Sequence, residues 1–246
     1  MQSLINLQNQ LDKEDVMNRA IMAVYENVVE VMKENFTVYS DFVFEKAYEA
    51  AMRPVDVQII DELDKEKEGK KGLMHNYAKL KLDLKIDGIK NIVLNTDTFS
   101  QKIEGTNLLS AMSENMGQAF LKYAEPTIRV IQELIVIKNS KEMRGNMVDC
   151  CKFLVTAGAT PEQRYAILSQ VEGCLNAALE MAIKFKDHEE VCSITEAFSL
   201  VMPSMDQKML EALPVKMQAV MGMISSMSRD IEKIYSEKEM DDDLTE

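Results

Sequence analysis

The chain has 246 residues, 46% hydrophobic and 28% charged, which fits one ordered domain or roughly five to six helical repeats of about 40 residues. Its net charge of −13 disfavours nucleic acid as a partner, because phosphates attract a basic surface, and suits basic proteins instead. No stretch resembles a signal peptide, and the apolar run at 134–137 is far too short to cross a membrane, so no membrane partner is expected.

Helix is the favoured structure, since only 9 Gly and 5 Pro interrupt a chain rich in Leu, Met, Ala, Glu and Lys. Residues 14–35 place apolar side chains at helical spacing and predict an amphipathic helix. A second helix is expected over 38–52. It ends before Pro54, because a proline disfavours helical backbone at the residue before it.

Residues 53–97 differ from the helices around them and predict a charged insertion loop. The acidic tract DELDKEKEGKKG is followed by LKLDLKIDG, whose alternation indicates that Leu80–Ile86 is extended. Two interpretations of the acidic tract stay open. It is either a solvated loop or a docking strip for basic cargo segments, with Asp61, Glu62 and Asp64 as the candidate cargo-binding residues.

The remainder of the chain predicts six further helices. Thr160 is a clear start signal, because an N-cap threonine is followed by proline at the first helical position and by Gln163 three residues later. Gly158 is expected to end the preceding helix, and Asp187 to cap the following one. The expected helices are 98–118, 124–137, 140–157, 160–184, 187–202 and 206–236, the last with a bend at Pro214.

The last of these helices carries an apolar stripe that includes Met217, Met221 and Ile224. No later helix follows to cover the stripe, so we expect it to fold back on the preceding pair or to wait for a missing repeat. Residues 239–246 predict a frayed acidic tail. The 19 methionines are interpreted mainly as gap-fillers of a helical core, and otherwise as an adaptable binding surface.

One pattern of two aromatic residues and an acid occurs twice, 84 positions apart: Phe36, Tyr39 and Asp41, then Phe120, Tyr123 and Glu125. Half of this offset is 42, within the roughly 40–47 residues of a two-helix HEAT or armadillo repeat. Such repeats bury their apolar faces only by stacking. Residues 1–246 therefore predict a single all-α HEAT-repeat α-solenoid of antiparallel helix pairs, an architecture typical of binding proteins rather than enzymes.

The repeated passages also predict which side chains lie between neighbouring helices. These are the aromatic and aliphatic residues in and just after each copy: Phe36, Tyr39, Phe42, Phe120, Tyr123 and Ile128.

The sequence is poor in groups that exchange protons or bind metal, so no catalytic residue, cofactor or metal site is expected. His188 and Cys192 share one helix face, but a zinc protease would need a second histidine where Cys192 stands. The other histidine, His75, lies in the insertion, where a surface role is expected. The cysteines share no repeating spacing and are interpreted as reduced core residues: Cys150, Cys151, Cys174 and Cys192.

In the order and spacing of these features, from about residue 12 onward, the chain resembles the importin β (karyopherin β) family, closest to its importin five, or importin beta three, branch. Residues 34–39 (ENFTVY) and 119–123 (AFLKY) are similar to the F-x-x-Y passage of that branch. Residues 57–68 (VQIIDELDKEKE) resemble its acidic loop, and residues 88–90 its G-I-K. Residues 141–144 resemble the start of an inner HEAT helix.

The resemblance implies a nuclear import receptor, or a fragment of one, that binds basic cargo proteins such as ribosomal proteins and histones. It further implies contacts with Phe-Gly nucleoporins, release of cargo by the Ran GTPase, and shuttling between cytoplasm and nucleus. Members of that family are several times longer than this chain. The sequence is therefore interpreted as a partial chain that lacks the N-terminal arch with which the family binds Ran.

Two other functions stay open from the sequence. A HEAT-repeat scaffold or adaptor subunit of another complex would share the fold, and recovery of a phosphatase rather than Ran would identify it. An enzyme hidden in a helical bundle would need a catalytic set that these residues do not supply.

Overall fold

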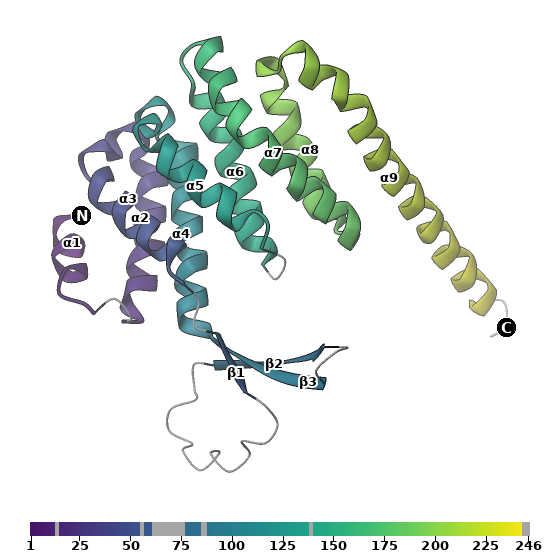
Figure 1. The fold of residues 1–246 in the computed structure, drawn as a ribbon, viewed down its shortest axis with the longest axis horizontal. Coiled ribbons are helices and arrows are strands. Elements are labelled where there is room, and N and C mark those ends of the chain that lie inside the picture. The colour runs from purple at the N-terminus through teal and green to yellow at the C-terminus, as the bar shows by residue number, and fades with distance from the viewer. Residues whose placement is uncertain (13–14, 55–56, 61–76, 85–87, 138–139, 243–246) are drawn as a thin grey trace. The chain divides into compact units, whose positions relative to one another are not determined.

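The fold is that of a computed structural model, which describes residues 1–12, 15–54, 57–60, 77–84, 88–137 and 140–242. The chain divides into two compact units, unit 1 (Met1–Leu134) and unit 2 (Ile135–Glu246). Helices make up most of both units, and strands occur in the middle of unit 1 (Figure 1).

Unit 1 contains one order of elements twice: a long helix, a 3-10 turn and a second helix. Helix α4 contacts both α2 and α3, and the short helix α1 contacts α2. In chain order the helical elements are α1 (Gln2–Gln8), α2 (Met17–Met32), η1 (Lys33–Val38), α3 (Ser40–Met52), α4 (Thr96–Asn115), η3 (Gly117–Tyr123) and α5 (Ala124–Leu134).

The two sequence passages that repeat are the 3-10 turns η1 and η3, each with the start of the helix after it. Because only one helical hairpin separates them, the offset of 84 residues is one repeat plus the insertion. Its interpretation as two periods of 42 residues was wrong. The period is visible without an insertion in unit 2, where α6 begins at Lys141 and α8 begins 47 residues later at His188.

The insertion contains a three-stranded antiparallel sheet with strand order β1-β3-β2. Its strands are β1 (Val57–Ile60), β2 (Tyr77–Leu84) and β3 (Gly88–Asn95), paired from Val57 with Leu94 and from Leu84 with Gly88. The prediction of a loop over 53–97 is therefore corrected for these strands. The expected extension of Leu80–Ile86 is confirmed for 80–84, while 85 and 86 lie outside the described residues.

Aromatic rings form the centre of unit 1. Phe44 on α3 stacks on Tyr123 with ring centroids 4.1 Å apart and meets the edge of Phe120 at 6.1 Å. Phe36, Phe120, Tyr123 and Ile128 are buried, as predicted. The rings of Phe120 and Tyr123 join η3 to α3, so these residues of the second repeated passage hold consecutive hairpins together.

Two of the predicted core residues are only half-buried, namely Tyr39 and Phe42. The buried face of α3 includes Val43, Phe44 and Ala47, at the spacing of one helical side. Phe42 lies off that side, where the ammonium of Lys46 stands 5.5 Å from its ring centroid. The prediction therefore identified the aromatic segment correctly, but the buried phenylalanine of α3 is Phe44 and not Phe42.

Unit 2 begins with helices whose N-termini are capped by side chains. Ser140, Thr160 and Asp187 each accept a hydrogen bond from a backbone N–H three residues later, which satisfies a donor that the helix itself leaves unpaired. The elements are α6 (Lys141–Ala157), α7 (Pro161–Phe185), α8 (His188–Val201), η4 (Met202–Ser204) and α9 (Gln207–Asp242).

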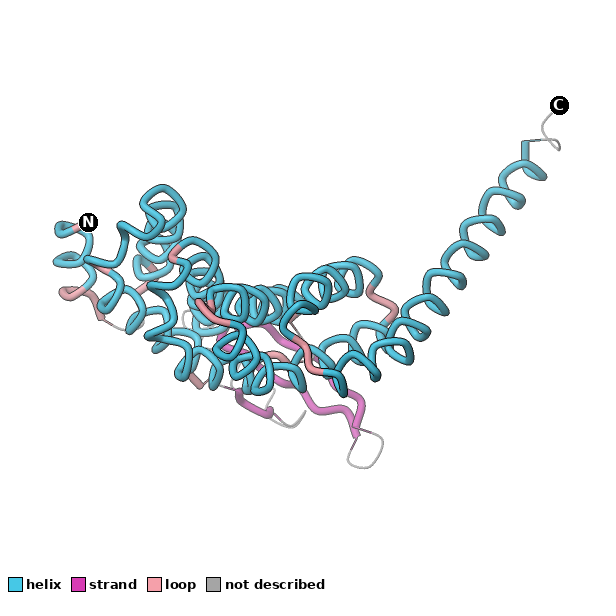
Figure 2. The backbone as a smooth tube through the Cα atoms, turned by 90° about the horizontal axis from the view of Figure 1, so that it is seen from above, coloured by secondary structure: helices cyan, strands magenta, loops and turns pink. Residues whose placement is uncertain are grey.

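Helix α9 contacts α7 near its start and then extends past α7 and α8 (Figures 1 and 2). Val220 is buried and Met217 is half-buried, whereas Met221, predicted on the same stripe, is 59% exposed. The helix continues to Asp242, so the first residues of the predicted frayed tail at 239–246 are helical. Among the helices in the described ranges, none is long and apolar enough to cross a membrane.

Candidate binding surfaces

The predicted cargo-binding residues Asp61, Glu62 and Asp64 lie outside the described residues and stay a prediction. Nine Asp and Glu and nine Lys and Arg occur in 53–97, so this segment is neutral overall. The net charge of −13 therefore belongs to the residues before and after this segment. A basic partner would meet this negative charge outside the insertion.

In unit 1, one acid joins the two repeats. Asp41, at the start of α3, accepts a hydrogen bond from Lys122 Nζ at 2.6 Å and another from the Tyr123 hydroxyl. That hydroxyl also lies 2.8 Å from the Ser40 hydroxyl. The bonds from Lys122 and then Tyr123 lower the pKa of Asp41, whose side chain remains 81% exposed. Asp41 thus stays charged at the surface while it fixes the junction of the hairpins.

In unit 2, a buried ion pair joins α6 to α8. Arg144 donates from Nε to Glu190 Oε1 at 2.6 Å and from Nη2 to Oε2 at 2.7 Å. Its third contact is the carbonyl of Ile137 at 2.8 Å. Both side chains are almost fully buried. This bidentate geometry fixes the register of the two helices, because each carboxylate oxygen meets one guanidinium nitrogen.

A second, exposed contact lies beside this ion pair. Lys141 Nζ is 2.8 Å from Glu189 and 3.0 Å from Asp187, and hydrogen bonds to Glu189 and then Asp187 raise the pKa of the lysine. The sequence analysis missed both contacts. A signal was present, because Arg144 and Glu190 are opposite charges 46 positions apart, which is one repeat.

The cysteines differ in burial more than predicted. Cys150 and Cys151 are buried core residues, Cys174 is half-buried and Cys192 is exposed. Burial raises the pKa of Cys151 well above its usual range, and burial also raises that of Cys174. These two thiols therefore stay protonated at neutral pH, which makes them poor nucleophiles.

His188 lies half-buried at the start of α8, one turn before the exposed Cys192. Within the described ranges, no three His, Cys, Asp or Glu side chains come together in a way that could hold a metal ion. His75 lies outside those ranges.

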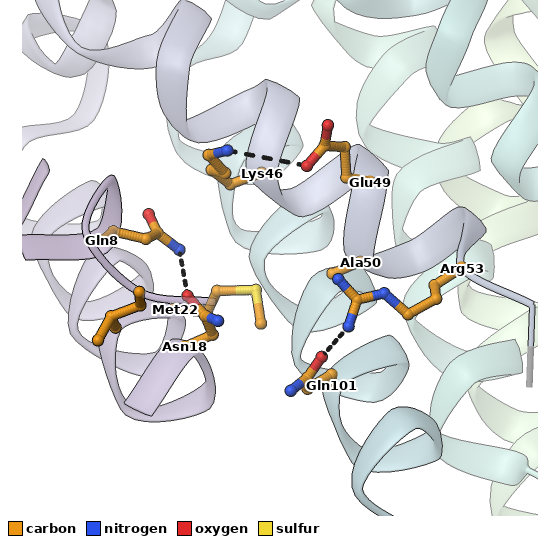
Figure 3. A pocket seen from close by; sticks show the side chains of 9 residues that line it. Gln8, Asn18, Met22, Lys46, Glu49, Ala50, Arg53 and Gln101 are labelled. Carbon is orange, nitrogen blue, oxygen red and sulfur yellow. Dashed lines mark hydrogen bonds and ion pairs between the residues drawn. The ribbon is translucent and has the colours of Figure 1, made fainter. Parts of the chain in front are cut away.

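Unit 1 contains a small polar pocket between α1, α2, α3 and α4 (Figure 3). It has a volume of about 50 Å³, enough for a small polar group or a few water molecules. Amide and charged side chains predominate on its walls, which are formed by Gln8, Leu11, Asn18, Met22, Lys46, Glu49, Ala50, Arg53 and Gln101. Sequence reasoning did not find this pocket, because its residues come from four separate elements and share no spacing.

Comparison with known proteins gives matches among solved structures only. No protein-family model matches the chain, and no curated protein sequence matches it. Kap121p bound to Nup53p has a TM-score of 0.65 at 12% identity, over 95% of this chain and 21% of that one. The karyopherin Kap121p bound to the extreme C-terminus of the phosphatase Cdc14p gives 0.66 at 13%, over 95% and 22%. Kap121p bound to RanGTP gives 0.61 at 12%, over 95% and 22%.

This similarity establishes the fold. The chain has the HEAT-repeat α-solenoid fold that Kap121p has, as the sequence predicted, with a sheet inserted between two of its repeats. It spans about a fifth of the length of the Kap121p chains that it matches.

Proposed function

We propose that this chain acts in nuclear import as a karyopherin-type receptor, or as a part of one, and binds basic cargo proteins. The similarity to Kap121p over 95% of the chain is the observation that carries the proposal. The similar structures are of a karyopherin rather than an enzyme, which supports a binding role.

The partners follow from the same comparison. Kap121p structures hold Nup53p, the C-terminus of Cdc14p or RanGTP. For this chain we propose Ran GTPase, Phe-Gly nucleoporins and basic cargo such as ribosomal proteins and histones, with shuttling between cytoplasm and nucleus.

Charge supplies the proposed mechanism of cargo binding. The chain has 41 Asp and Glu against 28 Lys and Arg, and a cargo tail rich in Lys and Arg would meet a complementary field. Each exposed ion pair contributes only about 0–1 kcal/mol, so several must act together. Asp61, Glu62 and Asp64 are the proposed contribution of the insertion, and exposed acids of the helices supply the rest.

A binding assay with the purified chain tests the proposal. Immobilised chain is incubated with a histone tail, a ribosomal-protein tail, a Phe-Gly peptide and Ran loaded with GTP. The proposal predicts that the basic tails bind. Displacement of these tails by Ran-GTP would show in addition that this part of a receptor binds Ran without the N-terminal arch. If none of these ligands binds, and the chain instead recovers a stable complex with another assembly, it is a scaffold or adaptor and the proposal fails.

Variants locate the cargo-binding charge. The triple variant Asp61→Asn, Glu62→Gln, Asp64→Asn should weaken binding of the basic tails. A matched variant removes three charges from exposed positions on helices of unit 1 instead: Glu30→Gln, Glu45→Gln and Glu114→Gln. If the insertion is the docking strip, its triple variant has the larger effect. If only the matched variant weakens binding, the insertion is excluded as the cargo site.

A further inference from the structure

The pocket of unit 1 contains a buried acceptor with no partner in the described structure. Gln8 is 5% exposed and lines the pocket, and its Oε1 accepts no hydrogen bond. Its Nε2 lies 3.5 Å from Asn18 Oδ1. Asn18 is itself oriented, because its Nδ2 donates to the carbonyl of Asp12 at 2.8 Å. Gln8 must therefore present its NH₂ to Asn18 and its oxygen elsewhere, and a buried acceptor without a donor is unfavourable.

Two residues with hydrogen-bond donors, Lys46 and Arg53, also line the pocket. Lys46 Nζ is 3.8 Å from Glu49, an ion pair longer than a hydrogen bond. Arg53 donates to the buried Gln101, whose amide oxygen faces the guanidinium (Figure 3). The pocket thus offers an acceptor at Gln8, and its other lining residues include Lys46, which carries an ammonium group, and the apolar Met22.

These groups discriminate between ligand classes. A carboxylate would bring two acceptor oxygens toward Gln8 Oε1, which needs a donor. An ammonium would meet two cations, Lys46 and Arg53, and only one carboxylate, Glu49. A primary carboxamide is neutral and matches both sides, because its NH₂ can donate to Gln8 while its C=O accepts from Lys46.

We infer that this pocket binds a primary carboxamide, supplied by an Asn or Gln side chain of a partner polypeptide. The volume of about 50 Å³ admits the end of one such side chain and excludes larger groups. This inference is independent of the transport function proposed above, since it rests on the unpaired oxygen of Gln8 and the donor of Lys46.

Methyl NMR of the 246-residue chain tests the inference directly. Met22 lines the pocket, so its ¹³C-labelled ε-methyl signal, assigned with Met22→Leu, reports occupancy. Acetamide should shift this signal saturably at millimolar concentration, and acetate and methylammonium should not. The same shift with all three probes, or with none, overturns the inference, because the pocket would then hold solvent or bind small polar molecules without preference.

Peptides and variants identify the source and the residues. Ac-Ala-Gln-Ala with an N-methylamide end should bind more tightly than acetamide, and its Glu counterpart should not bind. If the Gln peptide fails while acetamide binds, the ligand is a free amide and a polypeptide partner is excluded. Gln8→Leu should weaken acetamide binding by about tenfold, the equivalent of one hydrogen bond, while the exposed control Gln10→Leu leaves it unchanged.

Two more variants cover the case in which Gln8→Leu does not fold. Lys46→Met changes a half-exposed residue and should also weaken acetamide binding. Gln8→Glu replaces the amide with a charge and should shift the preference from acetamide to methylammonium. Unchanged acetamide binding in both variants would refute the assignment of Gln8 and Lys46.

Discussion

Phe120 is a buried residue at the junction of the two hairpins in unit 1. It is fully buried and its ring contacts those of Phe44 and Tyr123. Phe120→Ala should lower the free energy of unfolding by about 3–5 kcal/mol, because it removes buried apolar contacts and leaves a cavity. Urea unfolding followed by circular dichroism measures this loss.

The control makes the same substitution at a half-exposed ring. Phe185→Ala, with Phe185 52% exposed at the end of α7, should cost only about 1 kcal/mol. Equal effects of the two substitutions would mean that Phe120 is not buried between the hairpins.

The buried pair of Arg144 and Glu190 predicts a double-mutant effect. Arg144→Met leaves the carboxylate of Glu190 buried without a cation, and should destabilise the chain by about 3–5 kcal/mol. Arg144→Met combined with Glu190→Leu should recover most of this loss, since no uncompensated charge is left. Urea unfolding of the single and double variants checks the prediction, and a double variant no more stable than Arg144→Met would contradict it.

Asp41 predicts a pH-dependent contribution to stability. Hydrogen bonds from Lys122 and Tyr123 lower the pKa of Asp41 below its ordinary value of 3.8, so the folded state favours the charged carboxylate. The stabilisation is complete above the unfolded pKa and disappears as pH falls through the lower folded value. Asp41→Asn should therefore reduce thermal stability at pH 7, and this loss should become smaller as the pH is lowered from 7 toward about 2. A loss of the same size at both pH values would exclude the charge as its cause.

At the scale of elements, α3 and α4 approach so closely that only glycine fits at one position. A Cβ on Gly105 would lie 2.8 Å from the Ala47 carbonyl oxygen and 2.8 Å from the Ala51 nitrogen. Gly105→Ala should destabilise unit 1 by about 1–3 kcal/mol through overpacking, more than the gain in helix propensity returns. Gly145→Ala in α6, where a Cβ meets no atom within 4 Å, should instead stabilise by about 0.5–1 kcal/mol. Thermal unfolding of both variants tests this prediction. A Gly105→Ala variant as stable as the unsubstituted chain would show that α3 and α4 are farther apart at this position.

Helix ends could be predicted because their signals are local. Thr160 with Pro161, and Asp187, mark the starts of α7 and α8 in the sequence, and the structure places both caps there. The last residue of α3, Met52, lies just before Pro54, as expected. Capping chemistry involves residues three apart, so one sequence suffices to find it.

Contacts between elements were harder to predict. The sheet depends on the pairing of β1 with β3, whose residues Val57 and Leu94 are far apart in the sequence. The pocket joins Gln8 to Gln101, and the ion pair joins Arg144 to Glu190. Such contacts depend on the packing of distant segments and not on local propensity. The sequence therefore did not predict these residues, whereas the acidic tract could be recognised from its local composition.

At the scale of the whole molecule, the charge of the chain predicts how it meets a basic partner. Binding of a histone tail should weaken by about tenfold or more between roughly 0.05 and 0.3 M salt, because screening shortens the reach of exposed charges to less than about 10 Å. The physical reason is the net charge of −13, all of which lies outside the neutral segment 53–97. Fluorescence anisotropy of a labelled tail, titrated with the full chain at several salt concentrations, measures this dependence.

A Phe-Gly peptide provides the matched control for this prediction. It has no charge to screen, so its affinity should stay constant or rise slightly over the same salt range, since apolar burial does not weaken with ionic strength. A histone tail that binds equally at both salt concentrations would contradict charge as the basis of recognition, and would favour a shape-specific or apolar contact. If both ligands weaken in parallel, salt acts on the stability of the chain and not on the interface, which thermal unfolding under the same conditions distinguishes.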